Sequence, residues 1–551
     1  MNYKEFLNKV DNKLLEMSEK EKTALIHEFA RITKEENRKA FLEIIENKVE
    51  TKSYENQLND IYSWFTKINN KEIYFECTGD EIYNDHWHGQ WVYEYSDKFK
   101  IGSKIENSLQ IAENLLYQKN YKEAYKLYNT ICMTLYSAID IDCEETNELD
   151  FEELHEENLI NINLRHTAIN LLYSQYQASS PEKRVENLYS SFQWNMFNNI
   201  RIDEIFSVGP EEINGVDDFI EEWIDYLKTN DEQLAAKLLA DILTSYSNMN
   251  KLSEAAKETM AIHPSISLIY CKKLLERNEF ETIINFGKEI LVKMDTDIQI
   301  RSNILNIAAF AAEKMNDTHM KSTFAMDAFY SKSSILNYIK LFDTDNYKKY
   351  SEDGIIYINT LPEIDLEIRH HRNFEKLKNT ISEKEKNIIR FFNMEFEEIQ
   401  QICENEQLGW IYGNSEIIIP LFLLMLDKRS SYSKAGKRLI EDIQSSSFFE
   451  IETYNRPFNE YFFIWKEKVN LSKEEYDKYI LWCEKQVEKI VSDITNKNSR
   501  HVYYKAAELL VQMGEVLESN GKLNGKLLTA NHYKKINSRK SAFKAEIDKL
   551  L

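Results

Sequence analysis

The sequence predicts an all-α protein built from antiparallel helix hairpins, and three observations lead to this prediction. Glycine and proline are scarce, with 13 and 6 residues in a chain of 551, so few chain reversals can use positive-φ glycines or proline-set turns, which disfavours sheets with many tight hairpins. Paired amphipathic runs recur along the chain. Helix starts are marked by capping boxes, in which Glu follows a Ser or Thr after three residues: Ser18 with Glu21, Thr33 with Glu36, Ser382 with Glu385, and Ser472 with Glu475.

Composition and charge narrow the function classes. Apolar residues make up 43% of the chain, which is normal for a folded protein. The formal net charge of −23 argues against general attraction to nucleic acid or anionic lipid. The charge is uneven, because residues 142–157 hold nine acidic and no basic residues, whereas residues 500–549 hold ten Lys or Arg against five Asp or Glu.

Cysteine spacing and apolar runs predict a cytoplasmic protein that does not enter membranes. None of the six cysteines forms a CxxC pair, so neither a zinc knuckle nor a redox motif is indicated, and scattered cysteines are typical of reduced, cytosolic chains. The first thirteen residues lack the apolar core of a signal peptide. The longest apolar run, Ile417–Leu426, has about half the length needed to span a bilayer and contains Pro420. Enrichment in Lys, Asn, Ile, Glu and Tyr suggests a bacterial, AT-rich genome.

The N-terminal part divides into two segments. Residues 1–55 are predicted to form a helical cap, in which Leu25, Ile26, Phe29 and Ile32 share one helix face. Residues 56–104 form an irregular, aromatic-rich segment. Alternation between residues 91 and 95 fits a short strand or hairpin, and aromatic loop residues packed on helices would give the same pattern, so both interpretations stay open.

Residues 105–340 carry the repeated pattern. In IAENLLYQKNYKEAYKLYNTI an apolar helix ends at Lys119-Asn120, and a second helix begins immediately afterwards. This segment resembles the tetratricopeptide repeat (TPR), whose helix pairs interlock through a small residue in each helix and neighbouring aromatics. The residues that match the family's packing positions are Ala112, Tyr121, Ala124 and Tyr128, although Ala112 stands where the family usually has glycine and Ser108 where it prefers tryptophan. The resemblance implies a TPR-like α-solenoid.

The same hairpin shape recurs between residues 231 and 340. Predicted turns at Met249-Asn250, Asn278-Glu279 and Asn316-Asp317 are 28 or 29 and then 38 residues apart, which brackets the family's spacing of roughly 34. The predicted helices are 231–247, 253–261, 265–276, 280–293, 297–315 and 318–331. Further predicted packing residues are Phe280, Ala308, Ala312, Ala325 and Ala328. A plain bundle would also use alanines, but recurrence of the entire hairpin favours an array.

The remaining chain is predicted as a connector followed by a second helical array. Residues 341–375 are predicted to be irregular because of their tyrosines, Asp353-Gly354 and Pro362. Residues 376–551 return to helices with less visible repetition. The segment RHVYYKAAELLVQMGEVLESNG resembles the end of bacterial helical-repeat proteins that often carry SWIM zinc fingers, but the SWIM cysteines and histidines do not occur here, so the resemblance implies no zinc chemistry.

Catalytic and cofactor motifs are absent from the sequence. None of the patterns GxGxxG, P-loop, GxSxG and HExxH occurs in the chain. No cofactor is therefore predicted, and the sequence argues against an enzyme. The sharpest polar cluster is DEIYNDHWHG, in which alternate residues of an extended segment would share a face and bind a metal. Its candidate ligands are Asp80, Asp85, His86 and His88. Loops rich in Asp, Asn and His also arise from turn chemistry alone.

A second polar cluster, Arg369-His370-His371-Arg372, lies at the end of the predicted connector. Arginine forks match phosphate or carboxylate groups, and the same residues could pair with the chain's own abundant acids.

Three function hypotheses follow. The leading one is a protein-interaction scaffold or adaptor that binds a peptide or protein partner on its helical-repeat surface. The second is a metal-dependent enzyme or effector with a site around Asp80–His88. The third, which the net charge disfavours, is a nucleic-acid-associated subunit that uses basic residues near the C-terminus: Lys534, Lys535, Arg539, Lys540 and Lys544.

Overall fold

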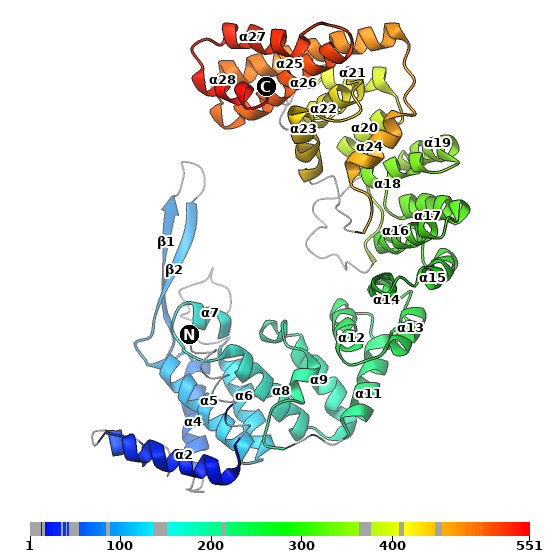
Figure 1. The fold of residues 1–551 in the computed structure, drawn as a ribbon. Helices are drawn as coiled ribbons and strands as arrows, with labels where there is room; N and C mark the ends of the chain where they lie inside the picture. The colour runs from blue at the N-terminus through cyan, green and yellow to red at the C-terminus, as the bar shows by residue number, and fades with distance from the viewer. Residues whose placement is uncertain are drawn as a thin grey trace. The chain divides into compact units, whose positions relative to one another are not determined.

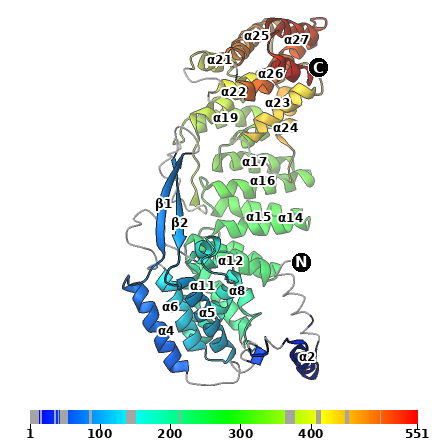
Figure 2. The ribbon, with the colours of Figure 1, turned by 90° about the vertical axis from the view of Figure 1, so that its left-hand side faces the viewer.

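The computed structural model is predominantly helical, as the sequence predicts (Figures 1 and 2). Helices account for 73% of it, and its sheet has two strands. It describes residues 13, 17–34, 37–39, 41–42, 54–83, 89–135, 151–211, 213, 215–362, 376–406, 413–446, 454–497 and 499–551. Within these ranges, no helix has both the length and the apolar character required to cross a membrane.

The chain forms two compact units. Unit 1 comprises Met1–Ile200 and Val208–Glu212, and unit 2 comprises Arg201–Ser207 and Ile213–Leu551. The division falls inside the range 105–340, which the sequence predicts to be one helical-repeat segment, and the finer domain boundaries stay a prediction.

Unit 1 consists of a strand hairpin and a set of helices. Its regular elements are α2 (Glu19–Ile32), α4 (Tyr54–Asn69), β1 (Glu76–Tyr83), β2 (Gly89–Ser96), α5 (Ile101–Tyr117), α6 (Tyr121–Leu135), α7 (Phe151–Glu156), α8 (Leu164–Ala178), α9 (Arg184–Phe192) and short 3-10 turns. Helix α6 packs against α4, α5 and α8. Strands β1 and β2 pair antiparallel from Glu76↔Ser96 to Tyr83↔Gly89. The alternation between residues 91 and 95 therefore belongs to a hairpin.

The apolar face predicted for the N-terminal helix is exposed in the structure. On α2, the residues Ile26, Phe29 and Ile32 are each more than half exposed. Thr33, predicted to cap a following helix, donates its hydroxyl to the Phe29 carbonyl at 2.6 Å, and its predicted partner Glu36 lies outside the described residues. By contrast, the capping boxes at Ser382 and Ser472 form as predicted.

The described regular elements of unit 2 are two short 3-10 turns, Leu341–Asp343 and Arg500–Val502, and a series of α-helices. The α-helices are α10 (Ile202–Ile205), α11 (Val216–Thr229), α12 (Gln233–Ser245), α13 (Met249–Glu258), α14 (Pro264–Glu276), α15 (Phe280–Lys293), α16 (Gln299–Lys314), α17 (Thr318–Ser331), α18 (Ile335–Lys340), α19 (Tyr347–Ile358), α20 (Glu383–Phe392), α21 (Phe396–Glu404), α22 (Ser415–Leu426), α23 (Lys434–Ser445), α24 (Phe458–Lys466), α25 (Lys473–Asn496), α26 (Tyr503–Ser519), α27 (Gly525–Ile536) and α28 (Ser541–Asp548).

Helices α12, α14 and α15 each contact both the next helix and the helix after it. Helix α14 packs on α12, α13, α15 and α16, and α16 packs on α15 and α17. Figure 2 shows α14 with α15 and α16 with α17 as neighbouring pairs. The apolar and small side chains of these helices therefore form one continuous set of interfaces.

Two of the predicted turns in this region are confirmed, and they have the same geometry. Asn278 and Asn316 both have φ of 57°, and the following residue donates back across each turn, from Glu279 to Leu274 at 3.0 Å and from Asp317 to Ala312 at 2.9 Å. In this left-handed conformation of the asparagine, the chain supplies donors to carbonyls at the end of the helix that would otherwise have no partner. The position usually taken by glycine is here an asparagine. The prediction at Met249-Asn250 was wrong, because Asn248 caps α13 and the helix has already begun.

The prediction of an irregular connector was wrong for residues 347–358, which form helix α19. The glycine that suggested a turn serves a close approach instead. A Cβ atom on Gly354 would stand 3.1 Å from ring atoms of Phe329 and Tyr338. Residues 363–375 of the predicted connector lie outside the described part of the chain.

The longest apolar run is a buried central helix of unit 2. All residues of α22 except Glu416 are buried, Pro420 included, and α20, α23, α25 and α26 pack around it. Burial on every side explains why this helix is apolar all round.

Four described cysteines are buried thiols. Cys132 lies in unit 1, and Cys271, Cys403 and Cys483 lie in unit 2. Burial raises the pKa of Cys132 and Cys403 to about 12 and also raises the pKa of Cys271 and Cys483. Cys77 in β1 is partly exposed.

Candidate binding site in the C-terminal helices

The residues predicted to pack between repeats lie in helices. Tyr121 and Phe280 are partly exposed. The Tyr121 ring meets the edge of Tyr173 at 5.9 Å, and its hydroxyl donates to the Glu211 carboxylate. The remaining predicted positions are buried: Ala112, Ala124, Tyr128, Ala308, Ala312, Ala325 and Ala328.

Most of the predicted metal and anion candidates lie outside the described part of the chain. Asp80 lies in β1, where its backbone pairs with Val92. The other candidates fall outside the described residues: Asp85, His86, His88, Arg369, His370, His371 and Arg372. Within the ranges the structure describes, no group of three or more His, Cys, Asp or Glu side chains is arranged to hold a metal ion.

Several basic residues near the C-terminus are engaged within the chain. Lys534 pairs with Asp548, Lys540 donates to the Thr495 carbonyl, and Lys544 donates to the Ser538 carbonyl. Lys535 and Arg539 are exposed. Three of the five basic residues of the nucleic-acid hypothesis thus have partners within unit 2.

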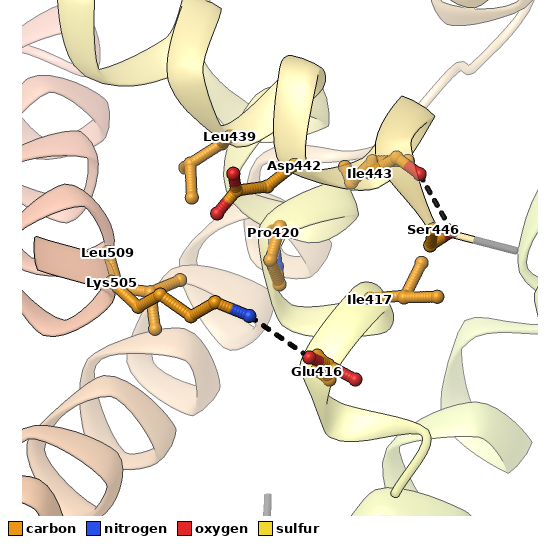
Figure 3. A pocket seen from close by; sticks show the side chains of 9 residues that line it. All are labelled: Glu416, Ile417, Pro420, Leu439, Asp442, Ile443, Ser446, Lys505 and Leu509. Carbon is orange, nitrogen blue, oxygen red and sulfur yellow. Dashed lines mark hydrogen bonds and ion pairs between the residues drawn. The ribbon is translucent and has the colours of Figure 1, made fainter. Parts of the chain in front are cut away.

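A hollow lies where α22, α23 and α26 meet (Figure 3). Its volume is about 50 Å³. Each helix contributes residues spaced three or four apart, which places them on one helix face. The lining residues are Glu416, Ile417 and Pro420 of α22, Leu439, Asp442 and Ile443 of α23 with its C-cap Ser446, and Lys505 and Leu509 of α26.

The side chains that form the wall of this hollow are mostly apolar, and one of them is a proline inside helix α22. Ile417, Leu439, Ile443 and Leu509 present aliphatic surface. Pro420 has no backbone N–H, so it cannot donate the helical hydrogen bond to the Glu416 carbonyl four residues earlier. Packing on all sides of α22 holds the proline inside the helix despite this loss.

Charged groups stand on this apolar wall. Lys505 forms an ion pair with Glu416, with 3.1 Å between Nζ of the lysine and Oε1 of the glutamate. Burial alone would lower the pKa of Lys505, yet the hydrogen bond to Glu416 raises it above its ordinary value. Lys384 approaches the other oxygen of Glu416 at 3.6 Å.

Asp442 is the carboxylate that faces the hollow. In Figure 3 its side chain points into the space between Leu439 and Pro420, whereas the Lys505 ammonium is directed at Glu416. No hydrogen bond or ion pair joins the Asp442 carboxylate to another described residue. Burial raises its pKa, and the nearby Glu416 carboxylate adds to the effect while Lys505 opposes it.

A second acid lies close to Asp442. Glu508 of α26 is only 2% exposed. Its Oε1 accepts from Arg438 at 3.4 Å, and its Oε2 is buried without a hydrogen-bond partner among the described residues. Burial, followed by the Asp442 charge, raises the pKa of Glu508 to about 7.

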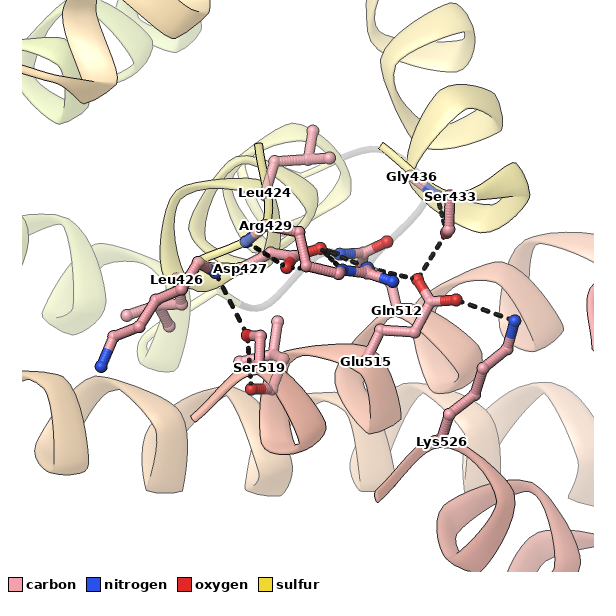
Figure 4. A network of polar contacts seen from close by, with 12 residues as sticks. Leu424, Leu426, Asp427, Arg429, Ser433, Gly436, Gln512, Glu515, Ser519 and Lys526 are labelled. Carbon is pink, nitrogen blue, oxygen red and sulfur yellow. Dashed lines mark hydrogen bonds and ion pairs between the residues drawn. The ribbon is translucent and has the colours of Figure 1, made fainter. Parts of the chain in front are cut away.

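A polar network anchors the same helices next to the hollow (Figure 4). Arg429 donates to Asp427 at 2.8 Å and to Glu515 at 2.7 Å. Gln512 donates to Asp427 at 2.8 Å, and Lys526 pairs with Glu515 at 2.9 Å. Both carboxylates are almost fully buried, so these partners compensate charges that would otherwise be costly.

The end of α22 is held by a half-buried lysine. Lys466 donates to the carbonyls of Leu424, at 2.9 Å, and of Asp427. Burial lowers the pKa of Lys466 to about 8. Since Lys466 and the Asp427 network fix the end of α22 and the start of α23 relative to α26, we assign them a structural role, which keeps the walls of the hollow in place.

Sequence reasoning missed Asp442, Glu416 and Lys505. They lie on three helices separated by 26 and 63 residues in the chain, and no local motif joins them. Pro420, a proline within an apolar run, was the only feature of this site that the sequence made visible. No protein-family model matches the chain, and no curated protein or solved structure is significantly similar to it.

Proposed function

We propose that this chain is a cytoplasmic scaffold with a TPR-like α-solenoid, which binds a peptide or protein partner on the surface of its helix hairpins. The observation that carries this proposal is the recurrence of one hairpin design in unit 2. The pairs α14–α15 and α16–α17 both close through a left-handed asparagine, and α14 contacts the first helix of the hairpin that follows it. The spacing of cysteines without a CxxC pair supports the cytoplasmic placement.

A stack of helix hairpins offers surface on which a partner can bind. Stacked hairpins bury small and apolar residues between neighbours, which leaves extended rows of helix surface for recognition. On α14, the half-buried Leu268 and the exposed Lys272 lie one turn apart and share a helix face. A partner helix or extended segment would contact such a row through alternating apolar and charged positions.

The proposal is tested by comparing substitutions on the Leu268–Lys272 row of α14 with a substitution on the surface of α15. The full chain, tagged, would be used for capture from lysate of the source organism, and bound proteins would be quantified. We expect Leu268→Asp with Lys272→Glu on α14 to reduce one captured protein at least tenfold. The matched control is Lys288→Glu, an exposed position on α15. Equal capture by wild type and both variants would contradict the proposal for this row.

A further inference from the structure

We propose that the hollow between α22, α23 and α26 binds the cationic side chain of a lysine or arginine presented by a partner protein. This inference rests on the proposed scaffold function and names the chemistry that one of its contacts would recognise. Asp442 would receive the charged head, and Pro420 with Leu439 would contact the aliphatic stem.

The size of the hollow excludes most other ligands. Small-molecule and cofactor pockets typically have volumes of about 300–1,000 Å³, whereas this hollow has about 50 Å³. A single water needs about 10–15 Å³ of such space. The hollow therefore accommodates the end of one side chain and is too small for a nucleotide or a cofactor.

The charge distribution selects a cation. The two cations whose charges act on Asp442 are already engaged, since Lys505 pairs with Glu416 and Arg438 pairs with Glu508. An entering ammonium or guanidinium would gain a charge-assisted hydrogen bond to Asp442. An anion would meet Asp442 and Glu416, and would be repelled.

A neutral apolar side chain is also disfavoured. It would cover the Asp442 carboxylate without offering a donor, and burying an unpaired charge is costly. Lysine and arginine satisfy both features of the hollow, because their methylene stems lie along apolar surface while the charged head reaches a polar partner.

The test uses blocked amino acids as probes on the full chain. Saturation-transfer NMR titration would compare each cationic probe with a neutral counterpart. Nα-acetyl-arginine amide would be compared with Nα-acetyl-citrulline amide, and Nα-acetyl-lysine amide with Nα-acetyl-norleucine amide. We expect at least one cationic probe to bind about tenfold more tightly than its neutral analogue, the gain expected for one charge-assisted contact. Equal binding of the charged and neutral probes would overturn the inference.

Variants locate the binding. Asp442→Asn is expected to weaken cationic-probe binding about tenfold, whereas Glu441→Gln, an exposed acid on the same helix, should leave it unchanged. Ser446→Lys places a cation of the chain itself at the rim and should compete with the probe. Circular dichroism would confirm that each variant is folded. Unaltered probe binding in both Asp442→Asn and Ser446→Lys would contradict the inference.

A last comparison separates this inference from the scaffold proposal. In the capture experiment, we expect Asp442→Asn to reduce the same protein that the α14 variant reduces. If the probes bind through Asp442 but Asp442→Asn does not change capture, the hollow is not a partner site and the inference fails. If Asp442→Asn reduces capture whereas the α14 variant does not, the inference stands and the assignment of the α14 row fails.

Discussion

Gly287 of α15 lies so close to Ala308 of α16 that a Cβ atom on Gly287 would stand 2.8 Å from the Cβ of Ala308. It would also stand 2.9 Å from the ring of Phe324 in α17. Three consecutive helices thus meet at one glycine, and this contact sets how closely the hairpins of unit 2 approach each other.

Gly287→Ala is therefore expected to destabilise unit 2. Alanine would gain about 1 kcal/mol of helix propensity, but overpacking a close contact costs about 1–3 kcal/mol, so we expect a net loss of about 1 kcal/mol. Urea unfolding would measure the change. Asn285→Ala, an exposed position on the same helix, serves as the control and should be slightly stabilising. A more stable Gly287→Ala variant would refute the close-contact explanation.

The left-handed turn at Asn316 gives a second prediction. Its side chain is exposed, so substitutions there change backbone preference and little packing. Asn316→Gly should be neutral or slightly stabilising, whereas Asn316→Val should cost about 1–2 kcal/mol, because a β-branched residue strongly disfavours positive φ. Thermal unfolding of the two variants would measure the difference. Equal stability of the Gly and Val variants would contradict the turn geometry.

The raised pKa of Glu508 predicts that the free energy of unfolding depends on pH. Because its pKa is raised to about 7 in the folded chain from an ordinary 4.5, the folded state holds a proton that the unfolded state releases. The stability that this group contributes is fully present below about pH 4.5, falls as the pH rises to about 7 and is constant above that. Glu508→Gln removes this loss, so we expect the variant to exceed the wild type by about 1–3 kcal/mol at pH 8.

The comparison needs two pH values and one control. Urea unfolding at pH 5 and pH 8 should show the advantage of Glu508→Gln growing with pH. Exposed Glu441→Gln should show no such growth. A Glu508→Gln advantage that is the same at both pH values would mean that Glu508 does not titrate in this range.

Tyr432 offers a fourth prediction. Its ring stacks on Phe463 at 4.5 Å, but its buried hydroxyl has no hydrogen-bond partner among the described residues. Tyr432→Phe keeps the ring and removes the orphan group, so the variant should be neutral or more stable by about 1 kcal/mol. Tyr338→Phe is the contrasting control, because the Tyr338 hydroxyl donates at 3.0 Å to Asn393, and its loss should cost about 1 kcal/mol. Destabilisation of both variants to the same extent would contradict the assignment.

Local signals made much of the helix layout predictable. The turns at Asn278 and Asn316 follow apolar runs that end abruptly, and helices 280–293 and 318–331 have the predicted bounds. Gly287 and Gly354 could not be understood in this way, because a glycine within a helical pattern signals a weak or broken helix unless the neighbouring helix is known.

The candidate site was not predictable for a related reason. Asp442 resembles any acid on an amphipathic helix until α22 and α26 are placed against it. Its position in an apolar hollow is a property of tertiary packing, as is the raised pKa of Glu508. The sequence candidates in 84–88 and 369–372 lie outside the described residues, so these site hypotheses stay predictions.

The buried cysteines give the protein a set of internal reporters. A thiol must become both exposed and deprotonated to react, and burial opposes both steps at Cys132, Cys271, Cys403 and Cys483. Alkylation at these positions would therefore record how often the surrounding helices open rather than what the surface looks like. Cys132 reports on unit 1 and the other three on unit 2, so mass spectrometry of labelled peptides can time the opening of each unit in the unmodified chain.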